Sequence, residues 1–108
     1  MLRKGSGNII FTGATSAIRG RKGAVDFSSA QFARRGLADA MARELWPQGI
    51  HVSHVIIDGV IDTDRVRKMY PLEAGELRMS TDDIAESYWQ LVQQGPVSYT
   101  HLTLPTKA

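Results

Sequence analysis

The chain of 108 residues contains no cysteine, which excludes disulfide bridges and metal sites built on thiolates. It also has no apolar run near the roughly 18–20 residues that a membrane-spanning helix needs. The amino-terminal region lacks the apolar core of a signal peptide, since its first apolar run, Ile9–Phe11, is short. We therefore expect a cytoplasmic protein without a membrane segment.

Aromatic residues make up only 7% of the chain and are not interleaved with the basic residues. Positive charge is nevertheless concentrated: residues 1–45 contain eight bases and three acids, whereas the remainder contains five bases and eight acids. A basic half can bind nucleic acid or an anionic cofactor. A site for single-stranded nucleic acid needs aromatic side chains among its basic residues, on which the nucleobases stack. Such aromatic residues are missing here, so we interpret the basic residues as solvated surface and expect no nucleic-acid partner.

The apolar pattern predicts two short buried strands separated by one long helix. The strands are Ile9–Phe11 and the Val- and Ile-rich segment His51–Ile57. The helix spans residues 25–45 and is stopped by Pro47 and Gly49. Apolar residues recur along it at steps of three or four, at Ala30, Ala33, Leu37, Met41 and Leu45.

A looser, charged segment follows Gly59, and a second helix is expected to begin after Ser80 and to extend to Gln94. Ser80 and Asp83 have the spacing of a capping box. The pattern is strand, helix, strand, loop and helix, as in parallel α/β sheets. Two parallel strands and two helices leave a sheet incomplete, because such sheets need several strands and cover on both faces.

The order of elements over residues 8–61 resembles the short-chain dehydrogenase/reductase family. Ala-Arg-Glu-Leu at residues 42–45, followed by Gly-Ile-x-Val at residues 49–52, carries the resemblance. It implies an α/β fold, an incomplete Rossmann-like fragment of a doubly wound parallel sheet. Residues 1–96 would then be the carboxyl-terminal half of such a domain.

The family's reaction is hydride transfer between a nicotinamide and a carbonyl or alcohol, and it uses a Ser, a Tyr and a Lys four residues after the Tyr. The resemblance places these positions at Ala14, Phe27 and Gln31. Phe27 has no ionisable proton and Gln31 has no charge, so the expected general acid is missing. A nearby hydroxyl could still orient a substrate, and the candidates are Thr12, Thr15 and Ser16.

The resemblance also implies NAD or NADP as the cofactor of a complete protein. The positions carried over to the cofactor are Gln31, which can hydrogen-bond a ribose, and Gly59 and Thr63 after the second strand. Asp58 replaces a proline there and would repel a cofactor phosphate. Residues 12–20 resemble a phosphate-binding loop, but two of its glycine positions hold other residues, so we expect no cofactor binding by this chain alone.

Two functional readings remain open beside that of a nucleic-acid module. The first is a fragment of an NAD(P)-dependent oxidoreductase with altered catalytic positions. The alternative is a non-catalytic binding or scaffold protein on the same fold. The three histidines, His51, His54 and His101, lack metal-ligand spacing, and we expect them to be packed or exposed rather than metal-binding.

Two further predictions concern association and the end of the chain. In the resembled family the long helix packs against its symmetry mate, which implies a homodimer or tetramer through residues 25–46. Residues 97–106, VSYTHLTLPT, resemble the translation of a sequencing-library adapter, so residues 97–108 are expected to be a non-native tail. The rival interpretation is a real final strand, since apolar and aromatic residues roughly alternate in this segment.

Overall fold

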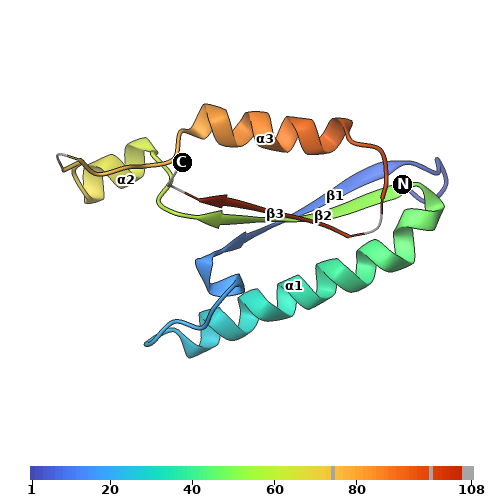
Figure 1. The fold of residues 1–108 in the computed structure, drawn as a ribbon, viewed down its shortest axis with the longest axis horizontal. Helices are drawn as coiled ribbons and strands as arrows, with labels where there is room; N and C mark the ends of the chain where they lie inside the picture. The colour runs from blue at the N-terminus through green and yellow to red at the C-terminus, as the bar shows by residue number, and fades with distance from the viewer. Residues whose placement is uncertain (74, 98, 106–108) are drawn as a thin grey trace.

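The computed structural model describes residues 1–73, 75–97 and 99–105, which form one parallel sheet between two layers of helix (Figure 1). The strands are β1 (Gly7–Ala14), β2 (Ile50–Asp58) and β3 (Thr100–Pro105). The α-helices are α1 (Val25–Leu45), α2 (Asp64–Met69) and α3 (Thr81–Gln93). Short 3-10 turns follow β1 at Thr15–Ala17 and follow α1 at Trp46–Gln48. The α/β class predicted from the pattern is confirmed.

The sheet has the order β1-β2-β3, and both pairs of neighbouring strands are parallel. The register places Gly7 beside Ile50 and Ala14 beside Ile57, so β1 and β2 finish at the same edge. Helix α1 lies on one face of the sheet and α3 on the other (Figure 1). This parallel arrangement brings the loops that follow β1 and β2 together at one end of the molecule.

The central strand β2 supplies most of the buried core. Its apolar side chains alternate between the two covered faces, as expected for an inner parallel strand. Both histidines of β2 are also buried. His51 Nε2 lies 2.8 Å from the Thr100 hydroxyl, and His54 Nδ1 lies 3.3 Å from the Tyr99 hydroxyl. The buried side chains of the strand are Ile50, His51, Val52, Ser53, His54, Val55 and Ile56.

Helix α1 faces the sheet with small and polar residues, and its fully or nearly buried positions are Ser28, Gln31, Ala38 and Ala42. Ala38 and Ala42 are fully buried, and Met41 and Leu45 pack against the cluster of Ala42 with strand residues. The other apolar residues of the periodic pattern, Ala30, Ala33 and Leu37, are exposed. In the first half of the helix these apolar positions therefore lie on the exposed surface and do not cover the sheet. Its small residues let the helix backbone approach the sheet closely, which a search for large apolar residues does not detect.

The segment after Gly59, expected to be loose, contains the short helix α2. The Val66 N–H donates to Thr63 Oγ1 at 3.2 Å, so Thr63 caps this helix. The predicted second helix is confirmed as α3, where the Asp83 N–H donates to Ser80 Oγ at 3.3 Å. No helix among the described residues is long and apolar enough to cross a membrane.

Residues 100–105 form β3, which pairs with β2 over Ser53–Asp58. This is the strand geometry that the alternation in the segment predicts. The origin of residues 97–108 in an adapter stays a prediction, and residues 98 and 106–108 lie outside the described residues.

Candidate active site

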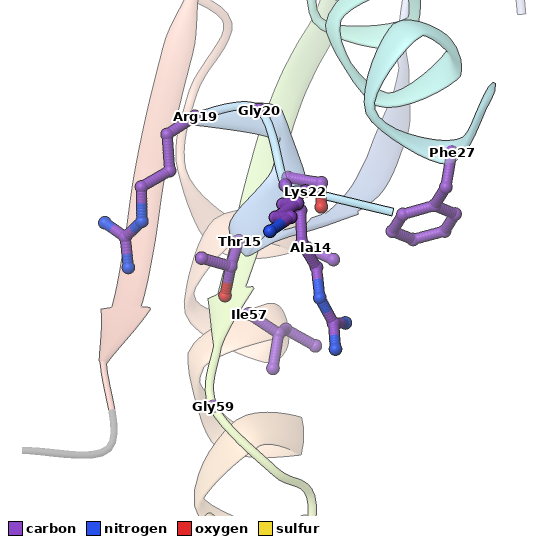
Figure 2. Close-up of a pocket in the computed structure, with 10 residues that line it drawn as sticks. Ala14, Thr15, Arg19, Gly20, Lys22, Phe27, Ile57 and Gly59 are labelled. Carbon is purple, nitrogen blue, oxygen red and sulfur yellow. The ribbon is translucent and has the colours of Figure 1, made fainter. Parts of the chain in front are cut away.

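The carboxyl ends of β1 and β2 and the first turn of α1 border a pocket of about 470 Å³ (Figure 2). The loop between β1 and α1 forms one wall, and the end of β2 forms another. Ligands of open α/β sheets bind at this edge, where strands finish and loops begin. The lining residues are Ala14, Thr15, Ser16, Arg19, Gly20, Arg21, Lys22, Phe27, Ile57 and Gly59.

The first and third family positions are joined by a hydrogen bond. The Ala14 N–H donates to Gln31 Oε1 at 3.0 Å, and the Gln31 side chain is buried against the end of β1. The amide oxygen of Gln31 is thereby used by the backbone, and its NH2 group is the remaining donor. Ala14 lines the pocket with a methyl group where the family has a hydroxyl.

Phe27, at the second family position, lies in the first turn of α1 and borders the pocket. Phe27 is 47% exposed, so it is not buried in the core. Figure 2 shows the ring across the pocket from Lys22 and Thr15. The structure therefore places Ala14 and Phe27 in the lining of one pocket. Gln31 does not line this pocket and is hydrogen-bonded to Ala14.

Two of the three candidate hydroxyls reach the pocket. Thr15 and Ser16 line it, whereas the Thr12 hydroxyl lies 2.6 Å from the Tyr88 hydroxyl of α3. Thr15 Oγ1 donates to Asp58 Oδ1 at 2.6 Å, which ties the loop after β1 to the end of β2. This contact cannot be predicted from local sequence, because it depends on the register of the two strands.

The two cofactor positions after β2 have different surroundings. Gly59 lines the pocket, directly after Asp58. Thr63 is not among the lining residues, and its hydroxyl caps α2. A structural role for Thr63 was not foreseen, although a Thr before Asp-Arg-Val-Arg at residues 64–67 is a helix-start signal.

The loop between β1 and α1 is basic and is anchored at both ends. Arg19, Arg21 and Lys22 line the pocket. The Arg21 N–H donates to the buried Ser28 Oγ at 3.0 Å, and Arg35 Nη1 donates to the Ala17 carbonyl at 3.2 Å. The loop contains a single 3-10 turn, and α1 begins only at Val25, whereas a dinucleotide phosphate loop opens directly into a helix.

A buried polar cluster lies beneath the pocket, on the α1 face of the sheet. The fully buried His54 ring packs against Gly13, and the Tyr99 hydroxyl lies 3.3 Å from His54 Nδ1 and 3.1 Å from His101 Nδ1. Burial lowers the pKa of His54, and the nearby His101 and Arg35 lower it further. Burial also lowers the pKa of His101. The described residues contain no group of three metal-binding side chains.

Several solved structures share the fold of this chain. A short-chain dehydrogenase from Rhodopseudomonas palustris is 38% identical, with a TM-score of 0.69 over 96% of this chain and 40% of that chain. The enzyme ElxO with NADP bound is 17% identical and shares the fold at a TM-score of 0.81, over 98% of this chain and 48% of ElxO. An apo SCOR enzyme from Clostridium thermocellum, 20% identical, has a TM-score of 0.74 over 97% of this chain and 42% of its own.

The chain thus spans less than half the length of the solved structures it matches. The family model described as short chain dehydrogenase matches residues 1–73, which is more than half of the chain. The relative from R. palustris has the same family in its description and exceeds 30% identity over nearly the whole chain. This chain belongs to the short-chain dehydrogenase family.

Proposed function

We propose that the chain is the carboxyl-terminal half of an NAD(P)-dependent oxidoreductase whose catalytic positions are altered. The observation that carries the proposal is the pocket at the ends of β1 and β2, which gathers two of the family's positions, Ala14 and Phe27. The third position, Gln31, is buried next to the pocket and accepts a hydrogen bond from the Ala14 N–H. In a complete protein this pocket would accept the carbonyl or alcohol that exchanges a hydride with the nicotinamide.

The residues present fit the nicotinamide end of a dinucleotide. Gly59 lines the pocket without a side chain. Gln31 is buried beside Ala14, and in a complete protein its NH2 group, which the hydrogen bond to the Ala14 N–H does not use, would donate to a ribose oxygen. The nicotinamide supplies or accepts the hydride when it is bound. The chain's own part is to position the substrate oxygen. Thr15 lines the pocket and its hydroxyl proton is donated to Asp58, so its oxygen would accept a hydrogen bond from a substrate alcohol.

The decisive experiment restores the missing acid in a complete protein that contains this chain. We expect slow turnover of ordinary alcohols and ketones, because Ala14, Phe27 and Gln31 supply no proton. General acid–base catalysis is typically worth about 10²–10⁴-fold. The double change Phe27→Tyr with Gln31→Lys should therefore raise kcat, read from NAD(P)H absorbance.

A matched control places the same residue types outside the pocket. Phe32→Tyr with Gln48→Lys changes two exposed positions that do not line it, so turnover should stay at the starting level. Circular dichroism of each variant separates a failed fold from a failed site, since Lys at position 31 removes the acceptor of the Ala14 N–H. No gain from the pocket variant, with the fold intact, would show that hydride transfer is not limited by a missing acid.

The second candidate is a non-catalytic binding protein on the same fold. The exposed aromatic ring of Phe27 favours it, because a ring in a pocket adds apolar contact area without chemistry. Under this hypothesis Phe27→Tyr with Gln31→Lys leaves turnover at zero, whereas Phe27→Ala weakens ligand binding. The two functions thus differ in which substitution has a measurable effect.

We also propose that the complete protein assembles through the outer face of α1. Ala33, Leu37 and Ala40 are exposed on this helix, and the Leu37 side chain is 51% exposed. Small residues beside one leucine would let a partner helix approach closely. The expected assembly is a homodimer or tetramer.

A further inference from the structure

The pocket combines a cationic wall with an apolar one. Arg19, Arg21 and Lys22 come from a single loop, and no carboxylate is among the lining residues (Figure 2). Phe27 and Ile57 supply the apolar wall. Within residues 1–73, 75–97 and 99–105, no ion pair involves the three basic side chains, since those present join Arg43 to Asp39, Arg67 to Asp62 and Arg78 to Glu76.

Two acids adjoin lining residues in the sequence, since Asp58 precedes Gly59 and Asp26 precedes Phe27. Asp58 Oδ1 accepts the Thr15 hydroxyl at 2.6 Å, and Asp26 Oδ1 accepts the Phe27 N–H at 2.8 Å. Two further bases lie behind the loop, where Arg34 and Arg35 donate to the carbonyls of Thr12 and Ala17. Even with both carboxylates included, this end of the molecule keeps an excess of positive charge.

Two hydrogen bonds hold the backbone of the basic loop between β1 and α1. The Ser28 hydroxyl, more than nine-tenths buried, accepts the Arg21 N–H at 3.0 Å, and Arg35 holds Ala17 at the other end. Anchoring the backbone at Ala17 and Arg21 keeps the segment that carries the three basic residues at the pocket, and like charges on one short segment repel one another. A bound anion would relieve that repulsion, so binding would gain from the arrangement.

We propose that this pocket takes a substrate with a carboxylate or phosphate group, and that Arg19, Arg21 and Lys22 determine this specificity. The inference rests on the proposed function for what happens at the other end of the substrate. The anion would lie on the basic loop, while the apolar body would lie against Phe27 and Ile57. Guanidinium groups suit both anions, because they present two parallel N–H donors to two oxygens.

The test needs neither a cofactor nor turnover, so its failure is distinct from failure of the proposed function. The 15N-labelled chain is titrated separately with succinate, inorganic phosphate, NADP and neutral succinamide, and backbone amide shifts are followed by NMR. Succinate or phosphate should shift the amides of residues 19–22 in a saturable way, and succinamide should not. Loss of one charged hydrogen bond lowers affinity about tenfold or more.

Three variants test the assignment. Replacing Arg19, Arg21 and Lys22 by Gln should weaken anion binding at least tenfold, whereas replacing the remote exposed bases Arg3, Lys4 and Lys68 by Gln should preserve it. Ser28→Ala keeps all three charges, and a smaller loss there would show that the anchor contributes. Three results would overturn the proposal: equal responses to succinate and succinamide, equal losses in both triple variants, or saturation of the loop by NADP but not by succinate or phosphate.

Discussion

Gly13 is the position where the candidate site is most sensitive to one added methyl group. A Cβ built on Gly13 would lie 2.6 Å from His54 Nε2 and 3.3 Å from Gln31 Oε1. Neither neighbour can move easily, because His54 is fully buried between the sheet and α1 and Gln31 accepts the Ala14 N–H. Gly13→Ala should therefore lower the free energy of unfolding by about 1–3 kcal/mol, the usual range for overpacking a core.

The measurement is urea unfolding followed by circular dichroism. Gly36→Ala is the matched control, because Gly36 lies in α1 with no atom within 4 Å of an added Cβ. Alanine in an exposed helix position should raise stability by about 0.5–1 kcal/mol. If Gly13→Ala is as stable as the wild type while Gly36→Ala behaves as expected, then His54 does not fill the space beside Gly13.

A double-mutant cycle assigns the effect to the histidine ring. His54→Ala removes the atoms that an alanine at position 13 would meet, so the two substitutions together should be less harmful than their separate effects predict. Coupling between residues in contact is typically about 0.5–3 kcal/mol. Additive behaviour of Gly13→Ala and His54→Ala would show that the strain lies elsewhere, such as at the amide oxygen of Gln31.

The remaining predictions concern pH, cofactor and assembly. The pKa values of His54 and His101 are lowered by burial in the folded state, so below about pH 6.5 the unfolded chain binds more protons than the folded one. Stability should then fall on acidification by at most about 1.4 kcal/mol per pH unit for each histidine, and His54→Gln should flatten the urea-midpoint profile. Calorimetric titration of the 108-residue chain with NADH or NADPH should give no binding, and micromolar affinity would contradict the proposal that the dinucleotide needs further protein. Leu37→Glu should shift a complete protein toward monomers in sedimentation, whereas Leu77→Glu, also at an exposed leucine, should not. A wild-type monomer would refute the interface.

The sequence alone was sufficient for the elements whose signals are local. The strand at residues 51–57, the helix from Val25 and the cap at Ser80 follow from periodicity, β-branched residues and capping chemistry, and all three are present. The helix α2 was missed, although Thr63 caps it, because six residues carry little periodicity. The residues that α1 packs against the sheet do not follow from apolar periodicity either, for a different reason. Ala38 and Ala42 are fully buried against the sheet because their small side chains let the helix pack close to it. A hydropathy pattern contains no information on the distance between a helix and a sheet.

For the site, alignment with the family motif predicted which residues take the catalytic positions. It did not predict which residues they contact. Counting from the Ala-Arg-Glu-Leu segment located Ala14, Phe27 and Gln31, and two of these do line one pocket. The contacts that shape the pocket join residues far apart in the chain, as Thr15 and Asp58 do across two strands. Asp58 shows the consequence most clearly. Its carboxylate is expected from sequence to repel an anion, yet in the fold it orients a hydroxyl while the neighbouring loop supplies three positive charges. The charge that lines this pocket therefore depends on all the side chains that the strand register brings together, and not on Asp58 alone.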